Sequence, residues 1–225
     1  MVMLKLTEAD HARVSAAIAE AEAKSDGEII AISADQSDAY HDVGLHYAVL
    51  VLFIVLAFFA AWPHQLELWW SWLMGWSAEP GLRQLLTLLL GIALLKFLVA
   101  LFLMKWRPLR LFLTPATTKT RRVRRRAIML FKTGAERRTV GRTGILIYLS
   151  MGEHRAEIVG DEAITAVTTP ETWGEAMATL ITHVKDGRPA DGIVAAVELI
   201  GEVLAEHFPK SHEDTNEIPD KLIEL

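Results

Sequence analysis

The chain has 225 residues, a formal net charge of −5 and no cysteine. Without cysteine it has no disulfide framework, no thiolate zinc site and no cysteine nucleophile. Apolar residues make up 52% of the chain and charged residues 23%. The apolar residues concentrate in positions 45–104 and the charges lie on either side, so the composition predicts two unlike parts.

The charges are also segregated by sign along the chain. Residues 1–44 carry three basic and nine acidic side chains, residues 105–142 carry thirteen basic and one acidic, and residues 143–225 carry five basic and sixteen acidic. The basic segment is therefore a local feature that the total charge conceals, and it needs a local explanation.

The first elements that the pattern predicts are a helix and a strand. Residues 7–25 predict a helix, because apolar residues recur at helical spacing and Thr7 can cap the first turn. Residues 28–34, EIIAISA, are rich in β-branched isoleucine and predict a short strand.

Two long apolar runs follow and predict a transmembrane hairpin. Leu45–Trp62 has no charged residue and Leu85–Met104 has only Lys96. About 20 apolar residues cover the roughly 30 Å hydrocarbon core of a bilayer. Two buried helices of a soluble core are the alternative, but helices of this length in soluble proteins show a polar face. A cleaved signal peptide is excluded by position, since 44 largely polar residues precede the first run.

The residues between and within the spans have simple membrane interpretations. Trp69, Trp70, Trp72 and Trp76 suit the membrane–water boundary, so residues 63–81 are expected to form a short loop on the membrane surface. The alternative is an aromatic cluster that holds a ligand. Lys96 is expected to snorkel or to pair across the hairpin, and a functional intramembrane charge is the other interpretation.

The basic segment directly follows the second span. Short flanks rich in Lys and Arg stay in the cytoplasm, so we expect a bacterial inner-membrane protein with two spans and both termini cytoplasmic. The segment also faces anionic headgroups, which attract such residues by about 1 kcal/mol each. Nucleic-acid binding is disfavoured, because the position beside a span already explains the charge. The predicted membrane-surface residues are Arg121, Arg122, Arg124, Arg125 and Arg126.

The second half of the chain predicts alternating helices and strands. Residues 117–134 predict a helix that ends at a glycine, and residues 144–150 and 154–160 predict a hairpin. Residues 169–187 and 189–208 predict two further helices with apolar stripes. Neither polar part is large enough to fold alone, so the two parts are expected to form a single α/β domain. The chain would leave this domain after the first strand, cross the membrane twice and then return to it. The predicted organisation is residues 1–42 and 115–208 as one discontinuous domain, 43–106 as the hairpin, 107–126 as a basic juxtamembrane segment and 209–225 as a loose polar tail.

Acidic residues are the main candidates for chemistry. The sequence has no phosphate-binding glycine loop and no hydrolase or zinc-protease motif. Asp161 and Glu162 directly follow the second hairpin strand, and Glu28 starts the first strand. Oxygen ligands of this kind suit Ca²⁺ or another hard divalent cation, and solvated turn residues or helix caps are the alternative. Arg155 is expected to form a surface ion pair.

These stretches together resemble the TPM domain, a family of bacteria and plant chloroplasts. The resemblance runs through AIAEAEAKSDGEIIAIS, RAIMLFKTGAERRTVGRTGILIYLSMGEHRAEIVGDEAI and AVELIGEVLAEHFP. It implies an α/β sandwich and places Glu28 and Asp161 on the family's G-E and G-D positions. Some members bind Ca²⁺ or other divalent cations, some have attributed acid phosphatase activity, and others act in assembly or repair of membrane complexes. Familiar members are anchored by a terminal helix, whereas here a hairpin interrupts the domain.

Two functions of different class follow. The first is a membrane-anchored binding or assembly module with divalent-cation binding, whose partner is another membrane protein or a second copy of the chain. The alternative is a metal-dependent acid phosphatase, in which Asp161 and Glu28 hold the ion and Arg155 contacts the phosphate. A transporter would need several copies, because two spans cannot line a pore.

Overall fold

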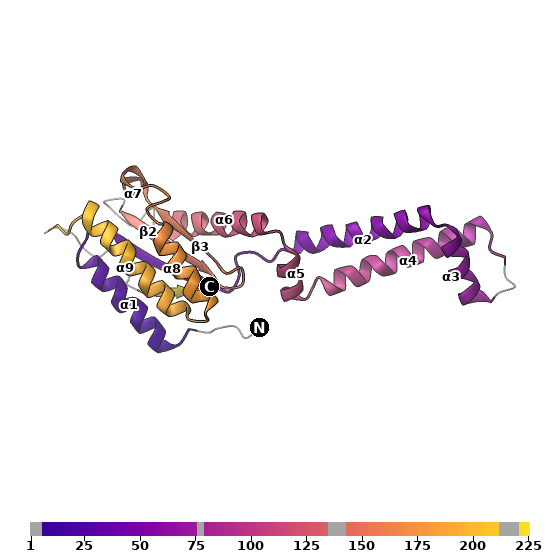
Figure 1. The fold of residues 1–225 in the computed structure, drawn as a ribbon, viewed down its shortest axis with the longest axis horizontal. Coiled ribbons are helices and arrows are strands. Elements are labelled where there is room, and N and C mark those ends of the chain that lie inside the picture. Colours follow the sequence, from indigo (N-terminus) through magenta and orange to yellow (C-terminus); the bar gives the residue numbers. More distant parts are fainter. Residues whose placement is uncertain (1–5, 76–78, 135–142, 212–220) are drawn as a thin grey trace. The chain divides into compact units, whose positions relative to one another are not determined.

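The structure is a computed structural model that describes residues 6–75, 79–134, 143–211 and 221–225. The chain divides into two compact units, Met1–Asp38 with Ala116–Leu225 and, inserted between them in sequence, Ala39–Pro115 (Figure 1).

A four-stranded mixed sheet forms the middle of the first unit. Its spatial order is β3-β2-β1-β4. β1 is parallel to both β2 and β4, and β3 is antiparallel to β2. The strands are β1 (Glu28–Ala34), β2 (Gly144–Ser150), β3 (Arg155–Gly160) and β4 (Leu222–Glu224).

Helices cover both faces of this sheet, so the unit has three layers (Figure 1). α1 (Glu8–Glu22), α8 (Gly174–Lys185) and α9 (Pro189–His207) lie on one face, and α6 (Ala116–Gly134) lies on the other. The alternation along β1 decides which side chain meets which layer: Ile29 packs with α1, α8 and α9, whereas Ile30 packs with α6. Burial on both faces explains why β1 and β2 are buried along their whole length.

The predicted α/β fold with an apolar helical hairpin inserted after the first strand is confirmed. Thr7 caps α1 in a reciprocal capping box with Asp10. The predicted strands 28–34 and 144–150 have the observed bounds of β1 and β2. The apolar stripe of α9 is buried as expected, through Ile193, Val197, Ile200 and Leu204.

Two local predictions were wrong, and one short helix was not predicted. The helix expected from residue 169 begins at Gly174, because Thr169 and Thr172 hydrogen-bond in a turn that includes Pro170. A short helix, α7 (Glu162–Val167), follows β3 directly. The tail expected to be loose ends in β4, which pairs with β1 through Ala31–Ser33. Residues 212–220 of that tail lie outside the described part of the chain.

The second unit contains α2 (His41–Ala61), α3 (His64–Met74), α4 (Leu82–Leu103) and α5 (Arg107–Leu113). α2 and α4 pack along each other (Figure 1). They approach through small residues: Ala48, Ala93 and Ala100 are buried, and a Cβ at Gly44 would lie 3.1 Å from Met104 Cβ. The predicted loop 63–81 is wrong over its first half, which is the helix α3, and Trp76 lies outside the described residues.

Two described helices, α2 and α4, are long and apolar enough to cross a membrane, by length and composition alone. Of their most apolar windows, 22% and 11% of the residues are buried inside the structure. Lys96 lies seven residues before the end of α4, about 10 Å along the helix, and it is exposed.

Candidate functional site

Asp161 caps a helix at one end of the sheet. Its side chain accepts a hydrogen bond from the Glu162 backbone N–H at 3.0 Å, and its own N–H donates to the carbonyl oxygen of Gly144 at 2.9 Å. Only 6% of Asp161 is exposed. The tight turn depends on Gly160, where a Cβ would lie 3.0 Å from Ile164 Cγ2. The helix-cap alternative for Asp161 is thus what the structure shows, since the carboxylate satisfies an N–H at the start of α7.

A cavity of about 260 Å³ adjoins this cap. Asp161 and Glu162 line it on one side, and Ile128, Phe131 and Lys132 of α6 line it on the other. Basic Lys132 therefore shares the wall with the two acidic residues. A positive charge in the same cavity opposes the binding of a second cation and favours a ligand that carries both signs of charge.

Glu28 lies at the same end of the sheet as Asp161. It is 4% exposed and stands opposite Gly144 in the register of β1 and β2. The backbone of Gly144 thus separates Glu28 on β1 from Asp161 after β3. Two strand spacings put their backbones about 10 Å apart. By alternation, Glu28 is on the α6 face of the sheet, the face on which the cavity lies.

In the described ranges, no three Asp, Glu or His side chains are grouped so as to hold a metal ion. Asp161, Glu162 and Glu28 would be the ligands of a divalent cation at this end of the sheet, and that site stays a prediction.

Arg155 lies at the opposite end of β3. Its register partner is Ser150, the last residue of β2, whereas Asp161 adjoins the first residue of β2. Asp161 is six positions after Arg155, which is about 20 Å of extended chain. Arg155 instead influences Glu157 on its own strand: burial raises the pKa of Glu157, and the positive charges of Arg124 and Arg155 oppose that rise. The structure therefore brings Glu28 and Asp161 to one end and does not bring Arg155 to them.

A comparison with models of known protein families identifies one family in this chain. Residues 110–203 match the family model of the TPM domain. The match identifies residues 110–203 as TPM-domain sequence, and we refer to the first unit, which contains nearly all of this segment, as the TPM domain. The matched segment contains α6, the β2–β3 hairpin and Asp161, and it begins after β1 and Glu28.

A solved structure shares the architecture of this TPM domain. The NMR structure of BA42 protein from the psychrophilic bacterium Bizionia argentinensis is 17% identical, with a TM-score of 0.57, and the match covers 100% of this chain and 99% of that one. At this identity the likeness shows the fold alone. No curated protein matches the chain.

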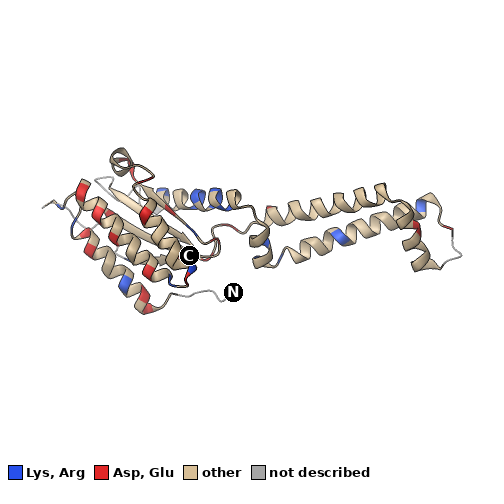
Figure 2. Cartoon of the chain, viewed as in Figure 1, with Lys and Arg blue, Asp and Glu red and all other residues tan. Residues whose placement is uncertain are grey.

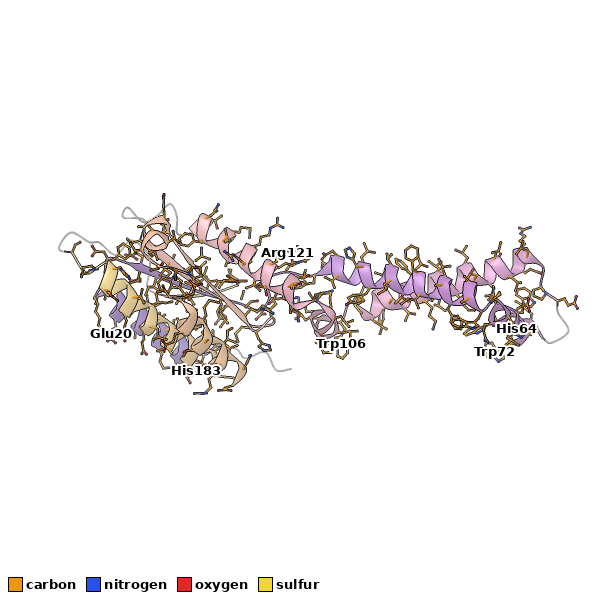
Figure 3. The ribbon with its side chains drawn as sticks, turned by 45° about the horizontal axis from the view of Figure 1, so that its top comes forward. Glu20, His64, Trp72, Trp106, Arg121 and His183 are labelled. Carbon is orange, nitrogen blue, oxygen red and sulfur yellow. The ribbon has the colours of Figure 1, made fainter. Side chains whose placement is uncertain are left out.

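The faces of the TPM domain differ in charge. Figure 2 shows Lys and Arg gathered on α6 and Asp and Glu on α1 and α9. On α6, Arg121, Arg124 and Arg125 are exposed, and Arg121 projects outward (Figure 3). Arg122 is half-buried and forms an ion pair with Asp38 at 3.0 Å. Of the predicted surface arginines, three are thus fully available to a partner, while Arg122 and Arg126 are partly covered.

The sequence interpretation missed a buried polar network at the Arg155 end of the TPM domain. Glu153 accepts hydrogen bonds from the Ser37 backbone N–H at 3.0 Å and from the Ser150 hydroxyl. The Ser37 hydroxyl lies 3.0 Å from the Tyr148 hydroxyl. Burial raises the pKa of Tyr148, and the negative charge of Glu153 adds to that rise. The network ties the β2–β3 turn to the segment after β1, and the Ser150–Glu153 spacing was its only signal in the sequence.

Proposed function

We propose that this is an inner-membrane protein that uses α2 and α4 as a membrane hairpin and presents its TPM domain as a binding or assembly module for membrane-associated partners. The exposure of α2 and α4 carries the proposal. Large side chains such as Phe53 and Phe102 are 63% and 71% exposed. An apolar surface of this extent is unfavourable in water by about 25 cal/mol per Å² and favourable in hydrocarbon.

The distribution of positive charge supports cytoplasmic termini. Lys105, Arg107 and Arg110 follow α4 at once, and α6 continues the basic segment, whereas residues 63–84 contain a single Lys or Arg, which is Arg83 in the first turn of α4. Positive flanks are retained on the cytoplasmic side of a bilayer. The exposed arginines of α6 begin eight residues after α5 in the sequence, and such residues attract anionic headgroups or an acidic surface of a partner.

A binding role accounts for the TPM domain better than catalysis does. The metal-dependent acid phosphatase alternative needs an ion and a phosphate contact in one centre. The roughly 20 Å between Arg155 and Asp161 prevents Arg155 from contacting a phosphate held at Asp161. A divalent cation at Asp161, Glu162 and Glu28 remains part of the proposal, as a structural ion. The partner would be another membrane protein or a second copy of the chain. We do not propose nucleic acid as a partner.

The test is the size of the particle that the full chain forms. Membranes that contain the tagged protein are washed with alkaline carbonate and extracted in mild detergent, and the protein mass is measured by light scattering. We expect a discrete complex larger than the 25.1 kDa chain. Arg121→Gln with Arg124→Gln and Arg125→Gln should weaken a partner that binds α6, and Lys24→Gln on the other face is the control. A uniform monomer in every detergent would contradict the proposal.

A further inference from the structure

A groove of about 860 Å³ lies inside the second unit, between α3 and α4. Trp70 and Leu73 form part of its wall from α3, and Arg83, Thr87, Gly91 and Leu95 form the wall from α4. Its size falls within the range of small-molecule sites, about 300–1,000 Å³. Trp72 of α3 does not line the groove and projects outward (Figure 3).

The groove changes from polar to apolar along α4. Arg83, Gln84 and Thr87 lie within the first turns, about 6 Å of helix, and every lining residue from Leu88 to Leu95 is apolar or glycine. From Arg83 to Leu95 the groove follows α4 for about 18 Å. One leaflet of a bilayer has a hydrocarbon depth of about 15 Å. The polar part and the apolar part thus match the headgroup and the acyl chain of one phospholipid.

The charge at the polar end selects the headgroup. Arg83 forms no ion pair with any residue in the described ranges. It is also in the first turn of α4, where the backbone N–H groups and the helix dipole favour an anion. A guanidinium that is not neutralised by the protein, beside a helix N-terminus, suits a phosphate.

The apolar end has space because of Gly91. A Cβ at this position would meet no atom within 4 Å. A Cβ there would enter open space at the wall of the groove, which makes Gly91 a suitable position for a bulky substitution that blocks it.

We infer that the α3–α4 groove binds one anionic phospholipid, with its phosphate at Arg83 and an acyl chain along Gly91 and Leu95. The inference rests on the proposed membrane hairpin and adds a specific ligand to it. The occupant is a lipid of the leaflet that meets the α3 end of the hairpin, because the polar end of the groove lies at that end of α4.

The test is native mass spectrometry of the full chain in mild detergent, titrated with phosphatidylglycerol or with phosphatidylcholine of the same chains. We expect one phosphatidylglycerol to bind about fivefold more tightly than phosphatidylcholine, as one basic contact provides. Arg83→Gln should remove this preference and Arg83→Lys should keep it. Gly91→Leu should weaken both lipids, whereas Ala57→Leu, an exposed position of α2 outside the groove, should weaken neither.

The outcomes separate this inference from the proposed function. Equal binding of both lipids, or a preference that survives Arg83→Gln, overturns the selection of an anionic headgroup by Arg83. A dimer that Gly91→Leu dissolves shows that a second copy fills the groove and overturns the lipid. Carbonate extraction of the same membranes tests the hairpin itself: an extracted protein refutes the proposed function, while a retained protein without lipid preference refutes only the groove. Helix content by circular dichroism confirms that each variant is folded.

Discussion

The role of Asp161 as a helix cap can be decided by comparing two substitutions at this position. Asp161→Ala removes the acceptor of the Glu162 N–H, and Asp161→Asn keeps an acceptor at the same place while it removes the charge. Asn and Asp are equally good N-caps, and loss of a cap costs about 1 kcal/mol. We therefore expect Asp161→Ala to destabilise α7 by about 1 kcal/mol and Asp161→Asn to have little effect.

The assay is native-state hydrogen exchange of the peptide that contains α7, in the full chain without divalent cations. The amide of Thr165 donates to the Asp161 carbonyl oxygen at 2.9 Å, so it exchanges only when the first turn of α7 opens. A loss of 1 kcal/mol accelerates its exchange about fivefold. Equal acceleration by Ala and Asn would refute the cap, since it would show that the charge of Asp161 matters and its hydrogen bond does not.

Three further predictions concern the TPM domain. Gly201→Ala gains about 1 kcal/mol of helix propensity, but its Cβ would lie 2.7 Å from Ala21 Cβ, and overpacking of this kind costs about 1–3 kcal/mol. Denaturant unfolding should therefore show a lower free energy of unfolding for Gly201→Ala and no loss for the control Gly174→Ala, whose Cβ would enter open space. Equal effects of the two substitutions would contradict the close contact between α1 and α9. Burial raises the pKa of Glu157 in the folded chain, so ionisation of Glu157 destabilises the fold once the pH rises above the pKa of glutamate in the unfolded chain. Glu157→Gln should therefore raise the melting temperature at pH 7 and should not raise it below that unfolded-chain pKa. A higher melting temperature at every pH would contradict a raised pKa of Glu157. If calcium binds at the predicted cation site, calcium at 100 times its dissociation constant should add about 2.7 kcal/mol to the free energy of unfolding, and Asp161→Asn should abolish this gain. A melting temperature that calcium does not change would refute the site.

The sequence predicts the long elements of this fold because each carries its own signal. The stripe of α9 and the isoleucine-rich β1 are local patterns that burial then confirms. β4 has three residues and is defined by its pairing with β1, so no local sequence pattern predicts it. α7 has six residues, fewer than two turns of helical periodicity.

The candidate site is predictable only in part, for a reason of geometry. That Asp161 and Glu28 share an end of the sheet depends on the register of β2 against both neighbours, which the sequence does not contain. The separation of Arg155 from Asp161 is different: Arg155 lies near the start of one predicted strand and Asp161 directly follows its end, so the length of the strand alone places them far apart. The Glu153 network joins residues more than a hundred positions apart and arises only in the folded chain.

The most direct test of the account is cysteine accessibility across the membrane, for which the natural absence of cysteine leaves a clean background. Glu79→Cys lies between the two apolar helices and Lys24→Cys lies on the TPM domain, and both positions are exposed. In intact spheroplasts, an impermeant maleimide should label Glu79→Cys and should label Lys24→Cys only after permeabilisation. Labelling of Lys24→Cys in intact cells, or recovery of both variants outside the membrane fraction, would contradict a hairpin that presents the TPM domain to the cytoplasm.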